Sequence, residues 1–426
     1  MIVATVAPAR EHDLRRLLAS MNRAPGTVNP QNGILPFAIF DRLHFARLLI
    51  LDDSTTADIK VYGTEPASYP TYLAFLGDVD GDPDEFLADL VGRSGRGLEA
   101  IFSHCVDFVG GAELFRWVKA RNHRSDTSYV NWIGRTVRQI REECALRESL
   151  LTYIQVNRRA TASMQGGEVL KALKKFAADE VQAGRLTLTP PEPTPLIWEL
   201  KNFLHLVGVP LALLALAPFL ILYVPFFIWQ LRRRETSDPE VIPRIDPAHA
   251  ALLASIEDHD VTNQFSAFGS VKPGLFRRST LIFFLWAIDY TTRHIFNRGR
   301  LARVSTIHFA RWVFLDNKKR LFFASNYDGS LDSYMDDFIN KVAFGLNLVF
   351  SNGIGYPTTN WLILDGAKNE QKFKYYIRRH QLPTEVWYRA HPGLTALDMQ
   401  RNALIRLGLE KAEMTKSELQ QWLQLF

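Results

Sequence analysis

Cysteine is scarce in this sequence, and so are the short motifs of well-known enzyme sites. The 426 residues include only two cysteines, Cys105 and Cys144, which excludes a disulfide framework and a cysteine-based metal cluster. The chain contains no P-loop, no GxGxxG after a strand, no GxSxG and no HExxH. Signatures of nucleotide-dependent enzymes, serine hydrolases and zinc proteases are therefore missing. The N-terminus has no basic leader before an apolar core, so we expect no signal peptide and a cytoplasmic first domain.

The net charge of the chain is also small. The formal net charge is +5, which is too weak to indicate nucleic-acid binding but is compatible with an anionic membrane surface. Hydrophobic residues make up 47% of the chain and charged residues 22%, as in ordinary globular proteins, so disorder, collagen and coiled coil are excluded. At about 150 residues per domain, the length predicts two or more domains.

An internal repeat is the strongest pattern in the chain. The tetrapeptide His-Phe-Ala-Arg occurs at 44–47 and again at 308–311, and each copy runs on into an apolar stretch that ends in aspartate. Farther along, the pair Asp80-Gly81 matches Asp328-Gly329. Several such matches in the same order over roughly a hundred residues predict a tandem duplication.

Both copies show the same expected order of strand, helix, two strands, helix and strand. In the first copy we expect strands at 2–7, 43–51, 71–76 and 128–133, and helices after Pro8 and at 83–99 and 112–121. In the second copy we expect strands at 266–271, 305–315, 320–325, 361–364 and 384–388, and helices at 275–297, 331–349 and 368–379. The predicted fold is thus α+β, a tandem duplication of ferredoxin-like βαββαβ units. Helices cover one face of such a sheet, so we expect the two open faces to pack together.

The apolar middle of the chain predicts insertion into a membrane. Residues 203–231 contain no charge, and a run of 29 residues exceeds the roughly 20 needed for a transmembrane helix. Prolines at 210, 218 and 225 interrupt it, and the run is flanked by Lys201 and by arginines at 232–234. Basic residues at both ends favour a re-entrant hairpin that turns near Pro218 and returns to the cytoplasmic face, with a single span as the alternative. The attachment is then monotopic or single-pass.

These patterns divide the chain into five expected segments. They are a first ferredoxin-like repeat (1–150), a helical connector (151–200), the membrane-inserted hydrophobic hairpin (201–234), a linker (235–262) and a second ferredoxin-like repeat with C-terminal helices (263–426). The apolar helix expected at 275–297 has basic ends, so it suits either the bilayer interface or a core position under the hairpin.

The repeated tetrapeptide is the first candidate for function. Strand alternation places the histidine on one face, with the alanine, and the arginine on the other. A buried arginine needs a carboxylate, and we expect Arg47 and Arg311 to pair with Asp80 and Asp328, which end the adjacent strands. One interpretation is a structural Arg–Asp clasp at the strand-to-helix turn, and its presence in both copies favours it. The other is a catalytic site in which these four residues handle protons beside a cofactor held by a histidine.

Gly77-x-x-Asp80-Gly81 within a duplicated ferredoxin-like unit resembles the dimeric α/β-barrel superfamily, and within it the dye-decolourising peroxidases, whose signature is GxxDG. The second copy reads Ser325-x-x-Asp328-Gly329 and lacks the first glycine. The resemblance implies a haem, with Asp80 as the distal acid and with His308 or His391 as the proximal ligand. His44 is a further candidate for binding the cofactor, and His308 is the candidate metal ligand. A solvent-facing turn is the simpler interpretation of His391.

Two classes of function follow. The first is a membrane-associated oxidoreductase, haem-dependent and peroxidase-like, that acts on a lipid or another apolar small molecule. The second is a non-enzymatic lipid-binding or membrane scaffold protein without a cofactor, in which the same residues only hold the turns. In both, the lipid bilayer is the expected partner, nucleic acid is not, and a homo-oligomer remains open.

Overall fold

Two four-stranded antiparallel sheets form the centre of the molecule. A computed structural model describes residues 1–241 and 244–426 of the chain. The first sheet has the order β1-β5-β4-β12, formed by Ile2–Thr5, Tyr72–Val79, Leu43–Leu51 and Thr384–Arg389. The second has the order β6-β8-β9-β7, formed by Thr127–Val130, Ile307–Leu315, Arg320–Asp328 and Thr262–Ser270.

Each sheet takes its fourth strand from the other half of the chain. β6 pairs with β8 of the second sheet, and β12 pairs with β4 of the first. The prediction that each repeat closes with its own last strand was therefore wrong. Sequence periodicity locates a strand but does not identify the strand with which it pairs. In the structure, β12 lies at the edge of the first sheet beside β4, and β6 lies at the edge of the second sheet beside β8. The boundary expected at 150 consequently does not separate the sheets.

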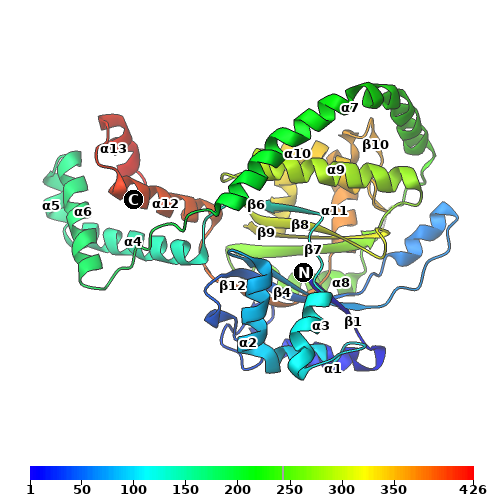
Figure 1. Ribbon diagram of the computed structural model, residues 1–426, viewed down its shortest axis with the longest axis horizontal. Helices are drawn as coiled ribbons and strands as arrows, with labels where there is room; N and C mark the ends of the chain where they lie inside the picture. The colour runs from blue at the N-terminus through cyan, green and yellow to red at the C-terminus, as the bar shows by residue number, and fades with distance from the viewer. Residues whose placement is uncertain (242–243) are drawn as a thin grey trace.

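The open faces of the sheets pack against each other, as expected. Leu49 and Leu76 of the first sheet belong to one buried cluster with Val313 and Phe322 of the second. The opposite face of each sheet is covered by helices, which gives four layers (Figure 1). The first sheet is covered by α1 (Glu11–Ala19), α2 (Pro83–Phe102) and α3 (Leu114–Ala120), and the second by α9 (Leu275–His294), α10 (Leu331–Phe350) and α11 (Glu370–His380).

A helical lobe projects from one end of the sheets (Figure 1). It contains α4 and α12, which follow the exchanged strands β6 and β12, together with the helices of the expected connector and the C-terminus. Its helices are α4 (Val137–Val156), α5 (Arg158–Ser163), α6 (Gly166–Gln182), α12 (Ala396–Glu410) and α13 (Lys416–Leu423). They share a core of their own, with Leu146, Leu173 and Ile405 at its centre.

The apolar segment forms one long helix, α7 (Leu196–Ser237), and all three prolines lie inside it. The expected hairpin with a turn near Pro218 was therefore wrong. Prolines spaced seven and eight residues apart can bend a helix without reversing the chain, and α7 is drawn as an arch over α9 and α10 (Figure 1). By length and composition it could span a membrane, and none of its most apolar stretch is buried.

Both ends of α7 rest on the same body. Near its start, His205 contacts His294 of α9 (Nδ1 to Nε2, 2.8 Å), and the hydroxyl of Tyr290 donates to the carbonyl of Leu206 (2.9 Å). Near its end, buried Glu235 accepts the backbone N–H of Leu362 (2.7 Å). The chain thus returns to the surface it left, although by an arch.

The remaining elements are short. The predicted linker 235–262 contains the last turn of α7 and helix α8 (Pro247–Ile256), and the strand expected at 361–364 is replaced by a hairpin of two-residue strands. These elements are η1 (Pro8–Arg10), β2 (Asn22–Ala24), β3 (Thr27–Val28), η2 (Phe37–Ile39), η3 (Thr56–Tyr62), η4 (Gly111–Glu113), β10 (Thr359–Asn360), β11 (Leu364–Asp365) and η5 (Gly366–Lys368).

Candidate functional site

The histidines of the repeated tetrapeptide lie in two matching irregularities of the sheets. The pairing register shifts between Leu43 and Phe45 in β4, and between Ile307 and Phe309 in β8. Such bulges turn a side chain away from the face that alternation assigns to it. His44 therefore packs on Phe309 of the other sheet, and His308 packs on Phe45, with ring centroids 5.3 and 5.5 Å apart. The expectation that each histidine shares a face with its alanine was wrong for this reason.

Each histidine is bonded to the aspartate that was expected to hold an arginine. The Nε2 atom of His44 lies 2.8 Å from Asp80 Oδ1, and that of His308 lies 2.6 Å from Asp328 Oδ1. The second carboxylate oxygen of each aspartate accepts a backbone N–H at the start of a lobe helix, from Val137 of α4 (2.9 Å) and from Ala396 of α12 (2.7 Å). A helix N-terminus favours a negative charge. Each His–Asp pair thus connects a sheet to the helical lobe.

The two arginines instead reach across the interface between the sheets. Arg47 lies on the inner face and is 3% exposed; it donates to the carbonyls of Phe265 (2.9 Å) and Ser325 (3.1 Å), to Ser266 Oγ (2.8 Å) and to the side chain of Asn326. Burial lowers the pKa of Arg47 to about 9. The expected Arg47–Asp80 clasp was wrong, because Arg47 reaches into the second sheet while Asp80 is already bonded to His44 and to the N–H of Val137.

Arg311 makes the matching connection in the opposite direction. It pairs with Asp78 and donates to the carbonyl of Gly77 (3.1 Å), both in the first sheet, so the expected Arg311–Asp328 clasp was wrong as well. Asn326 Nδ2 donates to Asp78 Oδ2 (2.8 Å) and so links the two arginines. Asp78 and Asn326 each precede a repeated Asp-Gly pair by two residues. Alignment of the two halves pairs these positions, which is the signal by which the sequence could have revealed them.

His391 lies in the centre of the histidine cluster. Its ring centroid is 5.9 Å from that of His44 and 6.2 Å from that of His308, and the side chain is buried. The solvent-facing turn that we preferred for it was wrong, since the chain after β12 passes between the sheets and the lobe. Trp132 holds the equivalent place after β6, two residues beyond the strand. The histidine therefore belongs to one half only.

Burial, followed by the charges of His44 and His308, holds the pKa of His391 well below its usual range. The unfolded chain takes up a proton below about pH 6.5 and the folded chain does not, so stability falls as the pH drops through this range. Between about pH 6.5 and 5 we therefore expect this histidine to lower the free energy of unfolding as the pH falls. The slope of the unfolding free energy against pH, measured by denaturant titration at each pH, should become shallower in His391→Gln. An unchanged slope would mean that His391 is protonated in the folded protein.

The His44–Asp80 pair opens on a cleft, and its counterpart does not. A cleft of about 610 Å³ is lined by His44 and Asp80, by the segment 130–136 and by Trp198 of α7. Among the described lining residues it includes neither His308 nor Asp328. The space next to His308 and His391 is about 30 Å³, which is room for about one water molecule. In the described part of the chain, the His–Asp pair of the first half thus borders a ligand-sized space and that of the second half does not.

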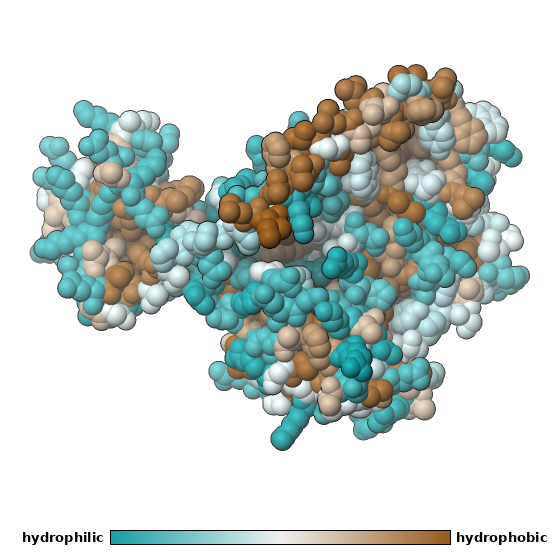
Figure 2. All heavy atoms as spheres, viewed as in Figure 1, coloured by the Kyte–Doolittle hydropathy of each residue, from teal (hydrophilic) through white to brown (hydrophobic). Residues whose placement is uncertain are grey.

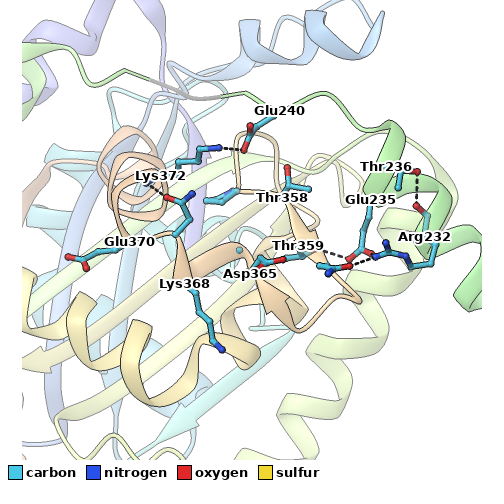
Figure 3. A pocket seen from close by; sticks show the side chains of 14 residues that line it. Arg232, Glu235, Thr236, Glu240, Thr358, Thr359, Asp365, Lys368, Glu370 and Lys372 are labelled. Atoms are coloured by element: carbon cyan, nitrogen blue, oxygen red, sulfur yellow. Dashed lines mark hydrogen bonds and ion pairs between the residues drawn. The ribbon is translucent and has the colours of Figure 1, made fainter.

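A second pocket, of about 760 Å³, lies at the C-terminal end of α7 (Figure 3). Two of its basic groups already have carboxylate partners. Arg232 pairs with Glu235 and Lys372 pairs with Glu240, each at 2.6 Å. Charges of both signs and a wide opening give this pocket little selectivity for one kind of ligand.

The histidines do not fit a haem at the positions described. His308 and His44 each direct Nε2 to an aspartate, and His391 borders a space of about 30 Å³, which cannot hold a porphyrin. Across residues 1–241 and 244–426, no three His, Cys, Asp or Glu side chains are grouped to bind a metal ion. The resemblance to dye-decolourising peroxidases stays a prediction. Comparison with family models, curated proteins and solved structures finds no match to this chain.

Proposed function

We propose that the protein is a monotopic membrane protein that binds a lipid or another apolar ligand from the bilayer. The arch of α7 is the observation that carries this proposal. A helix that is apolar all round must be surrounded by other apolar groups, and the apolar stretch of α7 is not buried in the protein. Both of its ends are bonded to the same body, so lipid contact at the middle of the arch would attach the protein to one side of a bilayer.

Helix α9 extends the apolar surface beside the arch. Phe283 and Trp286 are exposed on α9, whereas Leu281 and Leu285 pack on the second sheet. The helix therefore packs on the sheet with one side and leaves aromatic side chains exposed on another. Figure 2 shows the hydrophobic surface running along α7 above more hydrophilic parts of the body. Aromatic side chains are common at the level of lipid headgroups, which supports attachment along this edge.

A duplicated origin accounts for the pairs of matching contacts. Both halves carry a bulged histidine bonded to an aspartate, an aspartate bonded to the first N–H of a lobe helix, and an arginine that crosses between the sheets. We infer two ferredoxin-like units that exchange their fourth strands. Duplication with exchange makes the two halves inseparable, so the attachment of one half to a membrane holds the other beside it.

Attachment from one side can be tested by labelling. Thr194→Cys and Ser237→Cys place thiols at exposed positions just outside and at the end of α7, in a chain whose native Cys144 is replaced by serine and whose Cys105 is buried. In sealed vesicles, both thiols should react with an impermeant maleimide added to the cytoplasmic side. Reaction of the two thiols from opposite sides would indicate a single span and contradict the proposal.

An oxidoreductase is the second candidate, and the open His44–Asp80 pair is the observation that favours it. A histidine fixed by a carboxylate can move a proton at a ligand bound in the cleft. The haem predicted by the family resemblance has no place at these histidines, so we expect the purified protein to show no Soret band. A Soret band that disappears in His308→Ala would restore the peroxidase interpretation and require the cluster to open.

A further inference from the structure

We propose that the cleft beside the His44–Asp80 pair binds a long-chain carboxylate, whose carboxylate group pairs with Arg135 while its hydrocarbon chain follows the apolar wall toward α7. The inference rests on the proposed function, because the bilayer would supply the ligand. It adds the class of ligand, a monoanionic amphiphile, and the residue that selects it.

Within residues 1–241 and 244–426, Arg135 has no direct counter-ion. Its guanidinium lies over the ring of Trp132, 4.3 Å from the centroid, and lines both the cleft and the smaller space at the histidines. In the described part of the chain no carboxylate lies within 4.0 Å of it. Burial lowers its pKa, and the charged neighbour that opposes this shift is Glu143. Burial also raises the pKa of Glu143 to about 7, so this carboxyl is only partly ionised at neutral pH.

Several other charged groups that line the cleft already have partners. Arg138 pairs with Asp41 (3.3 Å), and Arg42 pairs with Glu85 (3.6 Å). Asp80 is bonded to His44 and to the N–H of Val137. Among the described lining residues Arg135 is the one guanidinium without a carboxylate partner, and a guanidinium, which binds planar anions through two parallel hydrogen bonds, suits one carboxylate. The nearby acidic side chains disfavour a dianion such as a phosphate monoester.

The rest of the cleft suits a hydrocarbon chain. Val79, Val130, Ile133 and Phe309 contribute apolar walls, and Trp198 of α7 closes one side. The volume of about 610 Å³ lies within the range of pockets for small ligands. Leu196 and Ile197, in the same first turn of α7 as Trp198, are 80% and 71% exposed. A chain leaving the cleft would therefore meet the apolar start of α7.

Binding of cis-parinaric acid, a fluorescent long-chain carboxylate, tests the inference. The full chain in phosphatidylcholine nanodiscs should bind it saturably above the baseline of empty nanodiscs. Arg135→Gln should weaken binding roughly tenfold or more, because a charge-assisted pair is lost. Arg116→Gln, the same change at an exposed arginine of α3, should have no effect. Arg135→Lys keeps the charge but not the planar fork, and should give an intermediate affinity.

A long-chain alcohol of matching length should displace the probe poorly from the wild type. Equal displacement by the alcohol, or equal binding by wild type and Arg135→Gln, would overturn the inference. Vesicle flotation distinguishes this failure from failure of the proposed function, since Arg135→Gln should float like the wild type. Intact flotation without saturable carboxylate binding would reject the ligand alone. Carboxylate binding without flotation would reject the membrane attachment alone.

Discussion

Replacing Arg47 by alanine should destabilise the protein by about 3–5 kcal/mol. The guanidinium is buried between the sheets and satisfies the carbonyls of Phe265 and Ser325 together with the side chains of Ser266 and Asn326. Truncation would leave these acceptors without a donor in a place that water does not reach, and would also leave a cavity. The loss should be measured as the change in unfolding free energy from denaturant titration of the detergent-solubilised protein.

Arg16→Ala provides the matched control for this substitution. Arg16 is exposed and pairs with Asp13 on the surface of α1, so its loss should change the unfolding free energy by no more than about 0.5 kcal/mol. The loss in Arg47→Ala should also exceed that in Arg311→Ala, because Arg311 is less deeply buried than Arg47. A change below about 0.5 kcal/mol in Arg47→Ala would mean that the inter-sheet network does not hold the two sheets together.

Two aspartates in the arch of α7 should abolish binding to lipid vesicles. Leu214 and Leu222 are 72% and 78% exposed, so Leu214→Asp with Leu222→Asp should leave the fold intact. Each aspartate within hydrocarbon costs about 2.5–3.5 kcal/mol, and together they should exceed the free energy that holds a shallow arch in the bilayer. Flotation with vesicles of phosphatidylcholine and phosphatidylglycerol measures the result, with the wild type expected at the top of the gradient and the variant at the bottom.

Val156→Asp is the control for the arch, since Val156 is 78% exposed at the end of α4 in the helical lobe. It should float like the wild type. If the arch variant floats equally well, α7 does not attach the protein. If the wild type fails to float and forms oligomers that the arch substitutions dissociate, the apolar surface is covered by a second copy of the chain, and the membrane proposal is wrong.

Positions of individual elements followed well from the sequence, because each depends on local periodicity. The strand expected at 43–51 coincides with β4, and the helices expected at 83–99 and 331–349 are confirmed within a few residues as α2 and α10. The repeated histidine, arginine and aspartate were recognised as a set, but the expected clasp at the strand-to-helix turn was wrong, because both arginines lie between the two sheets. The histidines pair with the aspartates instead, since a bulge of one residue reverses the direction of His44 relative to Ala46.

Residues that the sequence approach missed have no local signature. Arg135 lies in a short loop between β6 and α4, and it becomes significant only because the exchanged strand carries that loop to the mouth of the cleft. The importance of His391 arises in the same way, since β12 crosses to the first sheet and brings the histidine beside His44. Such contacts join residues that are far apart in the sequence. Hydrophobic periodicity reports only on residues that are close together in the sequence, so it cannot predict these contacts.

The sequence by itself determined most strands and helices, the recurrence of His-Phe-Ala-Arg and a charge-free segment long and apolar enough to span a membrane, since all of these depend on neighbouring residues and on transfer free energy. Only the tertiary structure decided that the halves exchange strands, that the prolines bend α7 into an arch, and that one His–Asp pair faces an open cleft while its counterpart is enclosed. Those outcomes depend on which surfaces, distant in the sequence, pack together when both sheets are buried.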